Sequence, residues 1–169
     1  TALKLIILGS EKHAQRITEK MEDLMDQVAG IARDQETLQS ETTKQSKDLE
    51  VFNDPELNPE EREDLVFLSE KQQQIGDRLS TLAQKGLALL DKASSNPIFD
   101  ASNLKDFGRS FGTMKEIATG QMQESRKEIQ LAQNLKRGAA NQSLSTASQM
   151  QFDALQRLKA LLDTFSEQM

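Results

Sequence analysis

The only histidine, His13, is the first residue that could bind a metal or exchange a proton. The 169-residue chain has no cysteine, so a zinc site would need carboxylates or a second chain to complete its ligands. His13 lies next to Ser10 and Ala14, which continue an apolar repeat backwards along the chain. We therefore interpret His13 as a solvated residue on a helix edge, and we predict no metal site.

A cluster of acidic residues near the middle of the first half could bind calcium. Its members are Asp54, Glu56, Glu60, Glu61, Glu63 and Asp64. The cluster lacks the alternating Asp/Asn ligands, the central glycine and the distal glutamate of an EF-hand loop. Acids at a helix N-terminus complement the helix dipole and cap its free N–H groups. The cluster therefore predicts a helix start.

Catalytic motifs are missing from the sequence. It contains no GxxxxGK[ST] loop, no dinucleotide-binding glycine motif and no HExxH. Three glycines, Gly108, Gly112 and Gly120, form a small-residue stripe that indicates close approach of a neighbouring helix or simple flexibility. Narrow helical hairpins rarely provide the enclosed pocket that catalysis requires. We predict that the protein is not an enzyme, needs no cofactor and is an unlikely receptor for a small molecule.

Composition narrows the classes of partner. The formal net charge is −6, and a field of that sign repels nucleic-acid phosphates and anionic lipid heads. The longest apolar runs, residues 5–8 among them, are too short to span a bilayer, so no transmembrane segment is expected. The chain begins with Thr, which predicts a piece of a larger protein. After these exclusions, the expected partners are other proteins or further copies of the same chain.

Apolar residues recur at spacings of three and four along four segments, which predicts an all-α protein of long amphipathic helices with coiled-coil-like packing. The first helix is expected from near residue 1 to Phe52. Asn58, Pro59 and Glu61 predict a capped start for the second helix after a turn. Its seam includes Gln72, which is expected to face Gln35, Thr42 or Gln45 of the first helix.

The second half repeats this organisation. Asp100 or Ser102 can cap a third helix, whose seam weakens after Met114, where Met122 and Ile129 lie one position along from the regular repeat. Gly138 is expected to end that helix. The fold expected is two successive antiparallel hairpins, residues 1–93 and 104–169, joined by a connector at 94–103. They are expected to stack as a four-helix bundle or an elongated rod.

The beginning of the chain is expected to project beyond the hairpin. If the second helix pairs antiparallel with the first, Leu89 near its end lies beside Ala29 or Leu24 of the first helix. Residues 1–20 then extend past the end of the second helix. Apolar side chains on two faces form the candidate interaction surface: Leu3, Leu5, Ile6, Ile7 and Leu8. Soluble proteins rarely leave such a patch exposed, so we expect the second hairpin, a second copy or an upstream region to cover it.

Three stretches carry motifs that occur together in a known class of protein. They are residues 34–38 (DQETL) with 41–42 (ET), residues 57–61 (LNPEE) with 68–72 (LSEKQ), and residues 135–138 (LKRG) with Gln151 and 154–158 (ALQRL). Together they resemble uncharacterised, planctomycete-type bacterial cell-envelope proteins with extended Gln-rich coiled-coil regions. The resemblance implies a periplasmic or envelope-associated setting and assigns no site residues.

The function expected is a non-enzymatic structural or protein-interaction module of a larger envelope-associated protein. The alternative is a carrier that holds an apolar ligand or lipid between its helices. Phe107, Phe111, Met114 and Met122 would line that site, although a Phe/Met stripe at helical spacing also forms an ordinary core.

Overall fold

The computed structural model describes the backbone of residues 2–168 and the side chains of residues 9–168. Its elements are α1 (Ala2–Glu50), α2 (Pro59–Ser94), α3 (Ala101–Ile117), η1 (Ala118–Met122), α4 (Gln123–Ala132) and α5 (Arg137–Gln168). The elements α3, η1 and α4 follow one another without a break and form one rod. The predicted all-α fold is therefore confirmed.

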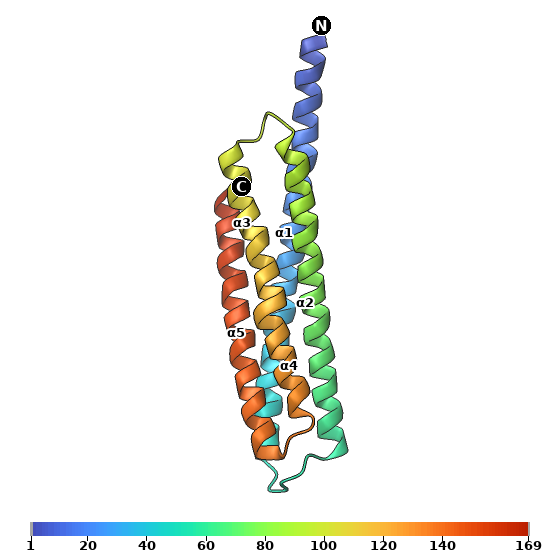
Figure 1. Cartoon of the computed structure of the whole chain (residues 1–169), viewed down its shortest axis with the longest axis vertical. Helices are drawn as coiled ribbons and strands as arrows, with labels where there is room; N and C mark the ends of the chain where they lie inside the picture. The colour runs from blue at the N-terminus through green and yellow to red at the C-terminus, as the bar shows by residue number, and fades with distance from the viewer. Residues whose placement is uncertain (1, 169) are drawn as a thin grey trace.

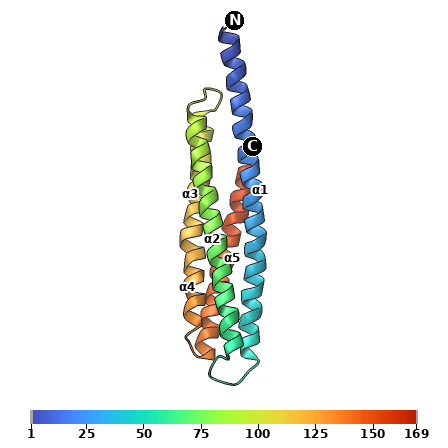
Figure 2. The ribbon, with the colours of Figure 1, turned by 90° about the vertical axis from the view of Figure 1, so that its right-hand side faces the viewer.

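The four helical rods run alternately in opposite directions and form one antiparallel bundle (Figures 1 and 2). Helix α1 packs against α2 and α5, and the rod of α3 and α4 packs against the same two helices on the other side. Each rod therefore has two antiparallel neighbours. Of the two expected arrangements, the structure has the four-helix bundle and not the elongated rod.

One continuous apolar core runs through all four rods and includes Val28, Leu79, Phe111 and Leu158, each 0% exposed. Helix α2 approaches α3 closely at Gly86, where an added Cβ atom would lie 2.3 Å from two ring atoms of Phe111. Only glycine leaves room for that ring, because a phenyl group packed on all sides cannot move aside without strain.

The rod of α3 and α4 contains one π-helical turn, η1, which explains the weakened apolar seam of this segment. A π-turn inserts one extra residue into a helix. Beyond it Met122 and Ile129 face the core, with 1% and 0% of their surfaces exposed, whereas Gln121 and Glu128 are only half-buried. The shift of the seam by one position was visible in the sequence, and its cause is this turn.

The helix starts follow the predicted caps. The side chain of Asn58 accepts a hydrogen bond from the N–H of Glu61, and Glu61 accepts one from the N–H of Asn58, which completes a capping box. Asp100 caps α3 by accepting from the N–H of Ser102. The expectation for Gly138 was wrong: α4 ends at Ala132, and Gly138 lies in the first turn of α5.

Helix α1 projects beyond the bundle, but by less than expected (Figures 1 and 2). Ala14 and Ile17 are buried, and the side-chain amide of Asn96, in the α2–α3 connector, donates to the carbonyl oxygen of Ser10 at 2.9 Å. The segment expected to overhang, residues 1–20, is therefore covered from Ser10 onwards. The reason is that α2 continues to Ser94 and the connector then folds over α1.

Candidate functional site

Among the described residues, the buried charged side chains are Arg137 and Glu61, which meet near the α1–α2 and α4–α5 loops. These two loops lie at one end of the bundle (Figure 1). Arg137 and Glu61 are 6% and 7% exposed. The Nη2 atom of Arg137 donates to Glu61 Oε1 at 2.7 Å, and its Nη1 atom donates to Glu61 Oε2. This fork between two nearly buried charged side chains is the strongest type of side-chain pairing.

The same guanidinium holds the α1–α2 loop by its carbonyl oxygens. Nε donates to the carbonyl of Asp54 at 2.6 Å, Nη2 to that of Glu56 at 3.0 Å and Nη1 to that of Leu49 at 3.5 Å. The backbone N–H of Arg137 donates to the carbonyl of Pro55 at 2.8 Å. An arginine has five N–H donors, and all five have partners here, so none is left to bind a substrate or ligand.

The ion pair changes the acidity of Glu61. The hydrogen bonds from Arg137 lower the pKa of the Glu61 carboxyl below its ordinary value of 4.5; burial opposes this shift, and the N–H of Asn58 adds to it. The hydrogen bond to Glu61 likewise raises the pKa of Arg137. Both groups are therefore charged at neutral pH, and their ion pair joins two loops.

A second buried polar site crosses the middle of the bundle and takes one side chain from each rod. Gln35 and Gln72 exchange two amide hydrogen bonds, at 3.0 and 2.9 Å. Ser125 and Gln151 both donate to Oε1 of Gln72, at 3.0 and 3.1 Å. The predicted contact of Gln72 with a polar position of the first helix is confirmed, with Gln35 as its partner.

This polar layer fixes the register of the helices, because sliding any rod by one turn would leave buried amides without partners. One atom is unsatisfied: Oε1 of Gln151 is buried and accepts no hydrogen bond from the described residues. The layer also lies beside the π-turn. Gly76 follows Gln72 by one turn, and a Cβ atom added to Gly76 would lie 3.7 Å from the Cβ atom of Met122, in η1.

We predict opposite effects from two matched substitutions in this layer. Gln151→Leu removes the unsatisfied acceptor and should leave the free energy of unfolding unchanged or raise it by about 1 kcal/mol. Gln72→Leu strands the amide of Gln35 and should lower it by about 1–3 kcal/mol. Urea unfolding of both variants measures the difference, and equal losses would show that Gln151 has a partner in solution.

The residues singled out for chemistry are not brought together. His13 is exposed and its Nδ1 atom is 3.3 Å from the amide nitrogen of Asn96. In the acidic cluster Glu61 pairs with Arg137, and the carboxylate of Asp54 accepts from the N–H of Glu56 at 2.9 Å. No group of three or more His, Asp or Glu side chains among residues 9–168 is placed to hold a metal ion.

The other sequence candidates divide between core and surface. Of the glycine stripe, only Gly108 faces a neighbouring helix, since an added Cβ atom there would lie 3.6 Å from Leu90 of α2, whereas at Gly112 and Gly120 it would meet nothing within 4 Å. The tightest helix approach is at Gly86 of α2. The candidate interaction surface of Leu3, Leu5, Ile6, Ile7 and Leu8 lies outside the described side chains, although the backbone there is helical.

Known proteins add no identification to this geometry. No helix in the described part of the chain is long and apolar enough to cross a membrane. In comparisons with known proteins, no family model, curated protein or solved structure matches the chain.

Proposed function

We propose that this chain is a non-enzymatic structural module that holds other proteins together or apart, with the projecting end of α1 as its docking segment. The observation that carries the proposal is that α1 continues as helix through Ala2–Gly9, past the connector that covers Ser10 (Figure 1). In sequence this end is the most apolar part of the chain and contains Leu3, Leu5, Ile6, Ile7 and Leu8. A helix end of this composition is suited to a groove on a partner protein.

The buried polar groups support a structural role. Arg137 and Glu61 are saturated by each other and by loop carbonyls, and the glutamine layer is satisfied across the rods except at one atom. Such networks specify one arrangement of the helices, and their donors and acceptors are already occupied, so few are left to bind a ligand. Contact with a partner is therefore proposed to occur on the outside of the bundle.

The setting and the alternative role have separate grounds. The bacterial cell-envelope setting follows from the sequence resemblance alone. The alternative role, a carrier of an apolar ligand, would use Phe107, Phe111, Met114 and Met122, and these side chains are 8%, 0%, 0% and 1% exposed. The rings of Phe107 and Phe111 pack against Phe165 at centroid distances of 4.8 and 5.9 Å. A ligand would have to separate this core, so we propose the interaction role.

The docking segment can be tested by making it polar without shortening the helix. In Leu5→Gln/Ile6→Gln/Leu8→Gln the helix propensity is retained, so the melting temperature should stay unchanged, because the described core begins at Ala14. Binding of a hydrophobic dye and association at high concentration should both decrease. The matched control, Glu11→Gln/Lys12→Gln, changes two polar residues on the same helix and should alter neither property.

Unchanged dye binding, solubility and mass in the triple variant would contradict the proposal, since the apolar end would then cover nothing. A large fall in melting temperature would contradict it as well, because the segment would then belong to the core of the bundle.

A further inference from the structure

A lysine-rimmed groove lies between α1 and α2 near the end from which α1 projects. Its apolar floor comes from Leu24, Leu82 and Leu89, and Ala88 lies beside them. Three lysines and one acid line the rim: Lys20, Lys85, Lys92 and Asp23. The local formal charge is therefore positive in a protein whose net charge is −6. Such a groove favours an apolar side chain that is surrounded by carboxylates.

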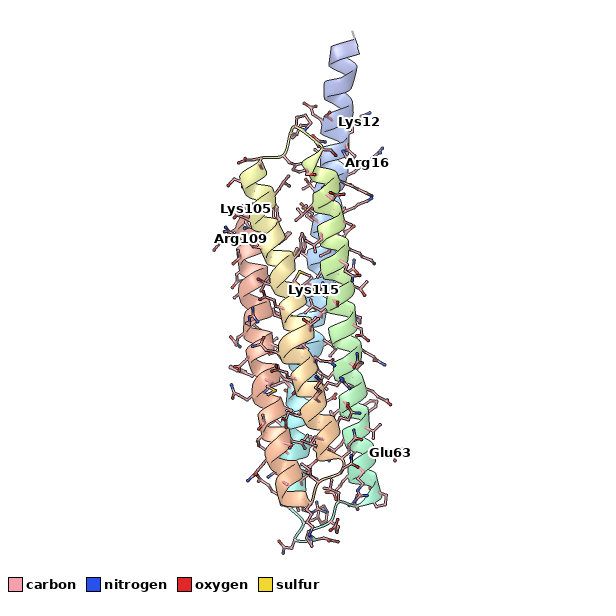
Figure 3. All side chains as sticks on the ribbon, in the orientation of Figure 1. Lys12, Arg16, Glu63, Lys105, Arg109 and Lys115 are labelled. Atoms are coloured by element: carbon pink, nitrogen blue, oxygen red, sulfur yellow. The ribbon has the colours of Figure 1, made fainter. Side chains whose placement is uncertain are left out.

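The opposite end of the same face presents a side chain of that description. Phe67 of α2 is 54% exposed, and the exposed acids around it on α2 are Glu60, Glu63, Asp64 and Glu70. Figure 3 shows Glu63 on the outside of the first turns of α2, at the opposite end of the bundle from Arg16 of α1. The ring of Phe67 lies beneath Lys71, whose Nζ atom is 4.5 Å from the ring centroid. Lys71 is itself paired with Glu41, so the unpaired charges of the described residues near Phe67 on α2 are the four acids, and this exposed apolar side chain complements the groove in apolar character and in charge.

Phe67 and the groove lie on one face because both lie along the seam between α1 and α2. Lys71 pairs with Glu41 at 3.1 Å, and Arg78 pairs with Asp34 at 2.7 Å, so both ion pairs bridge this seam. Along α2 the positions 67, 71, 74, 78, 85 and 92 follow the spacings of one helical stripe. On α1 beside the acidic end, Lys44 and Asp48 offset each other in formal charge.

The charges at the two ends of this face have no ion-pair partner among residues 9–168. In the described residues no ion pair involves Lys20, Lys85 or Lys92 at one end, or Glu60, Glu63, Asp64 or Glu70 at the other. Charges of opposite sign at the two ends of one face cannot meet in a single rigid bundle. They can meet when two copies of the face lie antiparallel.

We propose that the α1–α2 face binds the same face of a second copy in antiparallel orientation, with Phe67 of each chain in the lysine-rimmed groove of the other. Phe67 and Leu89 are 22 residues apart on α2, about 33 Å at 1.5 Å per residue. The midpoint is Arg78, so a two-fold axis through the Arg78–Asp34 pair exchanges the two contacts. Both contacts then form at once, as an isologous interface requires.

This interface is separate from the docking segment of α1 and does not depend on it. The test is therefore made in two backgrounds, the full chain and the full chain with Leu5→Gln/Ile6→Gln/Leu8→Gln. Sedimentation velocity up to about 1 mM protein at low salt should show a concentration-dependent dimer in both backgrounds. Added NaCl should dissociate it, because the exposed charges are then screened. Phe67→Ser should weaken the dimer about tenfold or more, as expected for a central aromatic anchor.

Charge reversal gives the sharpest form of the test. Lys85→Glu/Lys92→Glu makes the groove acidic, and Glu63→Lys/Glu70→Lys makes the Phe67 end basic. Each variant alone repels its own copy and should be monomeric, whereas a 1:1 mixture of the two should form a heterodimer, since both contacts are then attractive again. The control Glu124→Lys/Glu128→Lys, on α4, carries the same charge change and should not pair with the groove variant.

Association of the wild type that is lost in each reversed variant and regained in the mixture supports the antiparallel dimer. A wild type that stays monomeric, a dimer that persists in both reversed variants, or a mixture no more associated than its components would overturn it. Rescue by the α4 control would also overturn it, because the effect would then come from net charge and not from this face.

Discussion

Glu61→Gln should lower the free energy of unfolding by about 3 kcal/mol, because it leaves the buried guanidinium of Arg137 without a countercharge. The amide also places N–H donors against the N–H donors of Arg137, which already bond to Glu61 at 2.7 Å through Nη2. The guanidinium of Arg137 would then shift away from the amide, which would weaken its hydrogen bonds to the loop carbonyls of Asp54 and Glu56. Urea unfolding at neutral pH, monitored by helical circular dichroism, measures the loss.

The matched control is Glu63→Gln, two residues further along α2 and exposed, which should change stability by less than about 0.5 kcal/mol. Acid adds a second readout. The pKa of Glu61 is lowered in the folded protein, so its contribution is present above its ordinary value of 4.5 and is lost as the pH falls through the lowered value. The stability gap between wild type and Glu61→Gln should therefore narrow below pH 4.5, and a gap that widens there would contradict the buried ion pair.

Leu79→Ala should destabilise the protein by about 2–5 kcal/mol, because it opens a cavity in a core that cannot collapse around it. Leu79 is 0% exposed on α2, in the same continuous core as Val28 and Phe111. Its position in the middle of the bundle prevents relaxation by fraying of a helix end. The midpoint of urea unfolding should shift without a change in its slope.

Leu87→Ala is the control for this effect, since it makes the same substitution on the same helix at a position that is 42% exposed. It should cost well under 1 kcal/mol. Comparable losses at both positions would mean that the face of α2 that the bundle buries has been assigned wrongly.

Much of the fold could be predicted because helical periodicity is a local signal. The repeat of apolar residues places Ile31, Leu65 and Leu158 in the core, and all three are buried. The capping box of Asn58 and Glu61 depends on residues three apart, so it was also visible in the sequence. The choice between bundle and rod depends on contacts between the two hairpins, and the pattern of one helix does not encode these.

The Arg137 site was missed because its parts are distant in sequence. Arg137 stands 76 residues after Glu61, and a single arginine before Gly138 looks like the basic end of a helix. Helix α5 instead begins at Arg137, whose N–H donates to the carbonyl of Pro55. The one available signal was the absence of large apolar residues between Leu135 and Leu144, which is typical of a turn and a new helix start.

The π-turn illustrates a signal that was visible without its interpretation. The apolar seam makes two successive steps of four residues, from Met114 to Ala118 to Met122, where the regular alternation of three and four would place Gln121 in the core. Such a shift of the seam can arise from a local change in the number of residues per helical turn or from a break in the helix. The helix is not disrupted, because the backbone is helical on both sides of the turn, with φ of −64° and ψ of −45° at Ala118 and φ of −66° and ψ of −40° at Gln123.

The N-terminal end of α1 is proposed to dock on another protein. The most direct test of this docking is a photoreactive amino acid at position 6, irradiated in cells that make the protein at its natural level. We expect one discrete protein adduct from position 6, none from a probe at the exposed position 127 on α4, and loss of the adduct when Leu5 and Leu8 are both replaced by Gln. No adduct from position 6, or the same labelling from positions 6 and 127, would contradict the claim.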